Sequence, residues 1–162
     1  MKEVDHLNKT LIAYYSWSGH TAALAERLHA QTHADLYEIK APADTFSVDM
    51  YETADIAKAQ LKAGQLPPLA EPLPDLSKYD TILVGGPVWS GAPATPVLSF
   101  LAAIPDDDVR LAPFYTDAGT PGDYEAVFKR AAGKHSIASA LGLPGSKVAT
   151  AQTQIQQWLN QL

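Results

Sequence analysis

The sequence predicts an α/β fold in three layers, in which a doubly wound, five-stranded parallel sheet lies between two layers of helices. The first observation is a regular alternation along the chain: five short strand-like runs, each followed by a segment of helical periodicity. The second is that the first and third runs are almost entirely apolar, which is typical of strands buried on both faces of a parallel sheet. Right-handed crossovers between such strands place the intervening helices on both sides of the sheet.

The first half of the chain supplies two strands and two helices. A strand is expected at 10–15, the run Thr-Leu-Ile-Ala-Tyr-Tyr, and a helix from Thr21, where leucines recur four residues apart. A second strand is expected at 35–40, where polar and apolar residues alternate. A weakly amphipathic helix follows at 48–63, and then an extended connection at 64–78 that holds four of the 12 prolines.

The second half of the chain completes the alternation. The strongest strand is expected at 81–84, Thr-Ile-Leu-Val, followed by a helix at 96–104, a strand at 109–115, a helix at 124–131, a weaker strand at 135–141 and a terminal helix. Each of the three helices has an apolar stripe at helical spacing, formed by Val97, Leu98, Leu101 and Ile104; by Tyr124, Val127, Phe128 and Ala131; and by Ile155, Trp158, Leu159 and Leu162. The stripe assigns Trp158 to the core.

Length and composition indicate one globular domain. The chain has 162 residues, of which 46% are apolar and 19% charged, so residues 10–162 are predicted to form a single domain behind a polar tail at 1–9. The net charge of −6, without a basic cluster, argues against nucleic acid or an anionic membrane as the partner.

Residue types and segments that the sequence lacks exclude several kinds of site and of protein. The chain has no cysteine, which excludes thiol nucleophiles, iron–sulfur clusters, thiolate zinc sites and disulfides. No apolar run reaches the length of a membrane span, and the tail lacks the apolar stretch of a signal peptide. A cytoplasmic location is therefore expected.

The loop after the first strand has the chemistry of a phosphate site. In open α/β sheets, ligands bind beyond the carboxyl ends of the strands. The segment 16–21, Ser-Trp-Ser-Gly-His-Thr, offers three hydroxyls, a flexible glycine and the free N–H groups of a helix start. It lacks the lysine of a nucleotide-triphosphate loop and the G-x-G-x-x-G of a dinucleotide fold. Plain helix capping is the alternative interpretation.

Two further loops follow strands at the same edge. The segment 85–93, Gly-Gly-Pro-Val-Trp-Ser-Gly-Ala-Pro, is stiffened by prolines and carries Trp89. That side chain is either a stacking wall for a flat aromatic ligand or packs down onto the helix at 96–104. The segment 115–123 is small and turn-prone, which by itself is common in α/β proteins.

Other residues with reactive side chains have simpler explanations. Ser18 and Ser90 lie outside any G-x-S-x-G motif, so no hydrolase nucleophile and no catalytic residue is assigned. The histidines outside the first loop, His6, His29, His33 and His135, lack acidic partners at metal spacing, so no metal site is expected. The acidic run 106–108 is interpreted as a solvated loop, with partner docking as the alternative.

Two motifs together resemble the flavodoxin family. The run 15–21, Tyr-Ser-Trp-Ser-Gly-His-Thr, is similar to the family's phosphate loop, S/T-x-S/T-G-x-T. The run 79–91, Tyr-Asp-Thr-Ile-Leu-Val-Gly-Gly-Pro-Val-Trp-Ser-Gly, is similar to its Y-D-x-I-x-x-G-x-P-x-W-x-G segment. The resemblance extends over the whole chain in the order and length of the elements. It implies the strand order 2-1-3-4-5 and non-covalently bound FMN.

The resemblance also implies three groups of FMN-binding residues. The phosphate would be surrounded by Ser16, Trp17, Ser18, Gly19, His20 and Thr21. The isoalloxazine would be flanked by Pro87, Val88, Trp89, Ser90 and Gly91, and its pyrimidine side by Thr116, Asp117, Ala118 and Gly119. The chain departs from the family at His20, where asparagine is usual: the imidazole is either a cationic donor near phosphate or points into water. The third loop also lacks the family's usual pattern.

The function implied by the resemblance is electron transfer. The chain would carry electrons through FMN between a reductase and acceptor proteins, as a monomer or weak dimer, with its negative charge steering basic partners. An aromatic wall and a negative local field would disfavour a negatively charged reduced flavin. The reduced flavin would therefore be a strong electron donor. The alternatives are an FMN-dependent NAD(P)H:quinone-type reductase, and a binding module without redox function.

Overall fold

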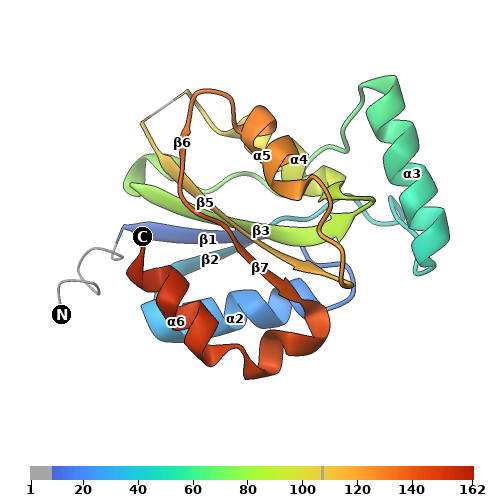
Figure 1. The fold of residues 1–162 in the computed structure, drawn as a ribbon. Coiled ribbons are helices and arrows are strands. Elements are labelled where there is room, and N and C mark those ends of the chain that lie inside the picture. The colour runs from blue at the N-terminus through green and yellow to red at the C-terminus, as the bar shows by residue number, and fades with distance from the viewer. Residues whose placement is uncertain (1–8, 107) are drawn as a thin grey trace.

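The computed structural model describes residues 9–106 and 108–162 and shows a parallel sheet between layers of helices (Figure 1). Residues 1–8 of the expected tail, with His6, and Asp107 of the acidic run lie outside the described residues. The elements in chain order are β1 (Thr10–Tyr14), α2 (His20–Thr32), β2 (Asp35–Glu38), α3 (Met50–Ala63), η1 (Leu76–Lys78), β3 (Thr81–Trp89), β4 (Ala92–Pro93), α4 (Thr95–Ala103), β5 (Arg110–Asp117), α5 (Tyr124–Ala132), β6 (Ser136–Ile137), β7 (Leu141–Pro144), η2 (Gly145–Thr150) and α6 (Gln152–Asn160).

The strand order confirms the predicted fold class. The sheet runs β2-β1-β3-β5-β6, with all of these neighbours parallel. This is the predicted order 2-1-3-4-5, because the short β4 lies off the path and pairs antiparallel with β3. The third strand is therefore longer than predicted: it continues beyond Val84 to Trp89 and turns back as a hairpin.

The predicted continuous strand at 135–141 is wrong. The structure has two short strands instead, β6 beside the start of β5 and β7 beside its end. The chain leaves the ladder between them because the carbonyl of Ser139 accepts a hydrogen bond from Trp158 Nε1 at 2.6 Å rather than from β5. Trp158 itself is 3% exposed, which confirms its predicted place in the core.

Alternate residues of β1 separate the two halves of the core. Leu11, Ala13 and Tyr15 pack on the side of α4 and α5. Ile12 and Tyr14 pack on the side of α2 and α6. This alternation follows from the two-residue period of a strand. Figure 1 shows these two helix pairs on opposite faces of the sheet.

Helix α4 is buried more completely than its predicted stripe requires. Every residue from Thr95 to Leu101 is buried, because the segment after α3 crosses its outer side. Ser99 Oγ donates to the carbonyl of Pro67 at 2.6 Å, and Thr95 Oγ1 donates to Gln60 Oε1 at 2.6 Å. In α5 the inward residue near the end is Ala132, not the predicted Ala131.

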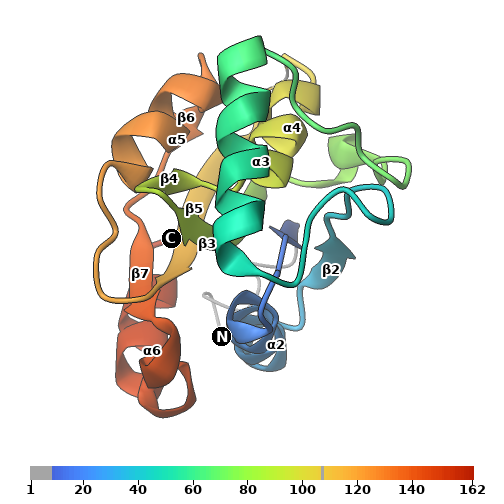
Figure 2. The ribbon, with the colours of Figure 1, turned by 90° about the vertical axis from the view of Figure 1, so that its right-hand side faces the viewer.

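Helix α3 belongs to neither helix layer, and its Gln60 contacts α4. Figure 2 shows it in front of the sheet edge, next to the β3–β4 hairpin. Only Thr53 and Ala57 of its 14 residues are buried, which agrees with its weakly amphipathic sequence. Within the described ranges, no helix is both long and apolar enough to cross a membrane.

Candidate functional site

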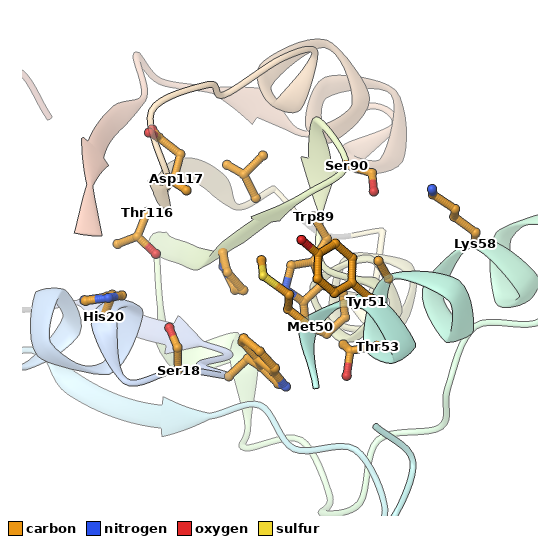
Figure 3. A pocket seen from close by; sticks show the side chains of 15 residues that line it. Ser18, His20, Met50, Tyr51, Thr53, Lys58, Trp89, Ser90, Thr116 and Asp117 are labelled. Carbon is orange, nitrogen blue, oxygen red and sulfur yellow. The ribbon is translucent and has the colours of Figure 1, made fainter. Parts of the chain in front are cut away.

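A cavity of about 400 Å³ lies at the carboxyl ends of the central strands, within the size range of small-molecule sites. Four segments line it: the β1–α2 loop, α3, the β3–β4 hairpin and the end of β5 (Figure 3). The cavity brings together ten of the residues expected from the sequence, namely Trp17, Ser18, His20, Pro87, Val88, Trp89, Ser90, Thr116, Asp117 and Ala118. The other five lie in the same loops without lining it: Ser16, Gly19, Thr21, Gly91 and Gly119.

The β1–α2 loop points unpaired amides outward at the start of a 13-residue helix. Gly19 is the N-cap, at φ 101°, and has no side chain with which to cap the helix. Ser16 Oγ accepts from the amides of Gly19 and Ala22, at 3.2 and 3.1 Å, and so holds the loop closed. Within residues 9–106 and 108–162, the amides of Ser18 and His20 have no acceptor. Such a helix start favours an anion.

His20 lies at this end of the cavity with its ring against the backbone of Gly145. A Cβ atom added to Gly145 would lie 2.6 Å from His20 Cγ and 2.7 Å from Cδ2. A larger residue at 145 would therefore displace the ring. Figure 3 shows His20 beside Ser18, below Thr116. His20 lines the cavity and is also exposed, so both alternatives for its imidazole, a donor near phosphate or a ring in water, stay predictions.

Trp17 ties the first loop to the segment before α3. Its indole Nε1 donates to the carbonyl of Ser47 at 2.9 Å, and the side chain is partly buried. Ser47 is held in turn by Thr53, whose hydroxyl donates to the same carbonyl at 2.8 Å. The position of α3 is thus linked to the loop that begins α2.

The predicted second loop is a tight hairpin. Val88 pairs with Pro93 and Trp89 with Ala92, which leaves Ser90 and Gly91 as the turn. Both turn residues have positive φ, 52° and 77°, as a two-residue hairpin turn of this kind requires. The backbone of the turn packs on the third loop, since a Cβ on Gly122 would lie 2.6 Å from Gly91 Cα. The two loops therefore pack backbone against backbone and form one continuous wall.

Trp89 is part of an aromatic cluster and also faces the cavity. Its ring makes edge contacts with Tyr15, at a centroid distance of 5.6 Å, and with Phe46, at 5.0 Å. Burial raises the pKa of Tyr15 to about 12. Trp89 is partly buried, because these rings cover one side of it. The other side still lines the cavity.

The third loop contributes one buried and one partly buried side chain. The hydroxyl of Thr116 lies 2.8 Å from that of Thr21, and both residues are buried. Asp117 Oδ1 accepts from the amide of Gly119 at 2.7 Å, which shapes the turn after β5. The hydroxyl of Thr21 is thus occupied by a partner within the protein.

The sequence interpretation missed the contribution of α3. Five of its residues line the cavity: Met50, Tyr51, Thr53, Ala54 and Lys58. The sequence places two large apolar residues, Met50 and Tyr51, directly after the helix cap, but only the structure shows that they are 59% and 78% exposed. Large exposed apolar groups beside one another mark binding surfaces more often than chance placement does. In the described part of the chain, no three histidine, aspartate or glutamate side chains form a metal cluster.

Comparison with known proteins identifies the fold and the family. A crystal structure of a flavoprotein in complex with FMN from Lactobacillus acidophilus NCFM is 35% identical, with a TM-score of 0.79 over 93% of this chain and 98% of that one. The NMR structure of the apo-form of the flavoprotein from the same organism is 37% identical, with a TM-score of 0.68 over 88% and 96% of the two chains.

A curated relative matches a shorter stretch. It is an NAD(P)H dehydrogenase (quinone) from Gluconacetobacter diazotrophicus, 35% identical over 95 residues. The match spans 58% of this chain and 45% of the relative's length. The family model described as flavodoxin matches residues 9–162, nearly the whole chain, and the chain belongs to the flavodoxin family.

Proposed function

We propose that the chain binds FMN non-covalently in this cavity and serves as an electron carrier between proteins. The observation that carries the proposal is the pairing of two surfaces in one cavity. One end has the unpaired amides that begin α2, and the other has the aromatic wall of Trp89. A phosphate suits the first surface and a flat ring the second. FMN carries both groups on one molecule.

The free hydrogen-bond donors at the cavity fit a ligand with one phosphate better than a ligand with two. Helix α3 also begins at the cavity, but its first amides are already used: Asp49 Oδ1 accepts from Tyr51 N at 2.8 Å and Glu52 N at 3.0 Å. A carboxylate at that position would also repel a second phosphate. This supports FMN over FAD as the ligand, and the related protein crystallised with FMN supports it independently.

Each segment of the site has a distinct role in this proposal. The amides of Ser18 and His20 would hold the phosphate, and Trp89 would cover one face of the ring. The Gly91–Gly122 contact would keep that wall in place during electron transfer. FMN, when bound, supplies the one- and two-electron chemistry. The net charge of −6 supports basic proteins as the partners.

The cofactor test uses the purified protein. It should be yellow, and acid release should yield FMN rather than FAD or riboflavin. Apoprotein should take up FMN more tightly than either of the other two, measured by quenching of flavin fluorescence. Recovery of FAD, or no uptake of FMN by apoprotein, would contradict the proposal.

A second candidate is an FMN-dependent NAD(P)H:quinone-type reductase. It is favoured by the exposed apolar side chains of Met50 and Tyr51 at the cavity mouth, where a flat substrate could pack, and by the curated relative of that name. A carrier should be reduced negligibly by NADPH or NADH alone and should need a reductase. Rapid direct bleaching of the bound flavin by either nucleotide would favour the reductase.

A further inference from the structure

The polar and charged groups of the cavity are separated along its length. His20 and the start of α2 lie at one end, as Figure 3 shows. Lys58 lies at the other, near the hairpin turn. Of the described residues that line the cavity, Lys58 is the only lysine or arginine, and Asp117 is the only aspartate or glutamate. A ligand with its phosphate at α2 therefore has a cation toward its far end.

The position of Lys58 is set by the helix rather than by an ion pair. It follows Ala54 by four residues and Tyr51 by seven, so the three share the face of α3 that borders the cavity. In Figure 3 the side chain extends from α3 in the direction of Ser90. Among residues 9–106 and 108–162, Lys58 forms no ion pair.

The one carboxylate that lines the cavity lies on a different wall from Lys58. Asp117 comes from the end of β5, on the opposite wall, and its Oδ1 is occupied by the amide of Gly119 at 2.7 Å. Asp55, three residues before Lys58, is exposed and does not line the cavity. The ammonium of Lys58 is therefore the main fixed charge at the far end of the site.

We propose that Lys58 sets the reduction potential of the bound flavin by stabilising negative charge on its reduced ring. The inference rests on the proposed function, with FMN in the cavity. Two electrons from an external donor and one proton at N5 leave the ring with one negative charge, and uptake of a second proton would neutralise it. An ammonium at the far end favours the charged form by Coulomb attraction. This opposes the sequence expectation of a negative surrounding field and a strong donor.

The test compares four proteins loaded with FMN and titrated with dithionite against a reference dye. They are the wild type, Lys58→Met, Lys58→Arg and, as the control, Lys62→Met, one turn further along α3 and outside the cavity. In Lys58→Met the affinity for reduced relative to oxidised FMN should fall about tenfold. For a two-electron couple this is a potential about 30 mV lower. Lys58→Arg and Lys62→Met should keep the wild-type potential.

The possible outcomes separate the inference from the proposed function. If Lys58→Met binds FMN and has the potential of Lys62→Met, the role of Lys58 is overturned while FMN binding stands. If wild-type apoprotein does not bind FMN, both proposals fail. Urea unfolding of each apoprotein verifies that the exposed substitutions leave the fold intact. A potential shift that shrinks in high salt would support a Coulomb origin, because salt screens exposed charges.

Discussion

The hydroxyl oxygens of Thr21 and Thr116 lie 2.8 Å apart in the buried interior, although 95 residues separate them along the chain. Thr21 is in the first turn of α2, directly after the proposed phosphate loop, and Thr116 is near the end of β5. The contact joins the first and third loops beneath the floor of the cavity. Both loops are thereby held in one arrangement before any ligand binds.

Breaking this pair on one side should destabilise the protein. Thr21→Val leaves the hydroxyl of Thr116 buried without its partner, and the free energy of unfolding should fall by about 1–3 kcal/mol. Thr116→Val should do the same. The double variant should lose less than the sum of the two, because no unpaired hydroxyl remains. Urea unfolding of the four apoproteins measures this. Strictly additive losses would show that the two hydroxyls do not interact.

Trp89→Ala should weaken both ligand binding and the fold. Loss of the stacking face removes about 1–1.5 kcal/mol beyond area burial, so FMN should bind roughly tenfold more weakly or worse. The contacts with Tyr15 and Phe46 are lost as well. Since fully buried tryptophans cost about 3–5 kcal/mol, this partly buried one should cost about 2 kcal/mol in the apoprotein.

The matched control for Trp89 is Trp89→Phe, which keeps a ring in the same place. It should retain most of the affinity and most of the stability. Fluorescence titration with FMN and thermal melting of the apoprotein measure the two effects separately. A destabilised Trp89→Ala apoprotein with unchanged FMN affinity would assign this residue to the core alone.

The contact between His20 and Gly145 predicts a coupled effect on phosphate recognition. Gly145→Ala should push the His20 ring away, because the new Cβ would lie 2.6 Å from its Cγ. Loss of the contact between this side chain and the phosphate should weaken FMN binding by roughly tenfold. His20→Ala should have the same effect, and the double variant should be no worse than either single one. Riboflavin, which lacks the phosphate, should bind all four proteins equally.

Fluorescence titration with FMN and riboflavin provides the measurement. If the double variant weakens FMN binding by the product of the two single factors, Gly145 acts independently of His20. Equal weakening of riboflavin binding would place the effect at the ring rather than at the phosphate.

Stability should fall at high pH, in part through Tyr15. Burial raises the pKa of this phenol to about 12 in the folded protein, above its ordinary value of 10. Its contribution to stability is complete below pH 10 and is lost as the pH rises from 10 through 12, because the unfolded chain ionises first. Tyr15→Phe should make this decline shallower in urea unfolding at successive pH values. Tyr51→Phe, at a ring that is 78% exposed, is the control and should leave the slope unchanged.

Local patterns were enough to predict the alternation of the main strands and helices, and the order of the parallel sheet follows from it. Short apolar runs such as 81–84 and helical stripes such as that of Trp158 are local patterns, and they require no knowledge of distant contacts. Because crossovers between parallel strands are right-handed, few arrangements of these strands in one sheet then remain. The carboxyl edge of the sheet was predictable as the place of the site for the same reason, and so were the three loops that meet there.

The side chains that complete the cavity could not be found from local patterns, because they depend on how distant elements pack. Helix α3 has few buried residues, so its pattern gave no indication that Tyr51 and Lys58 face the strand ends. The edge contacts of Trp89 with Tyr15 and Phe46 join three distant segments. The same holds for the Thr21–Thr116 pair and for the His20 ring on Gly145. Contacts between residues far apart in the sequence leave no local periodicity, because they depend on how whole elements pack rather than on the conformation of any one element.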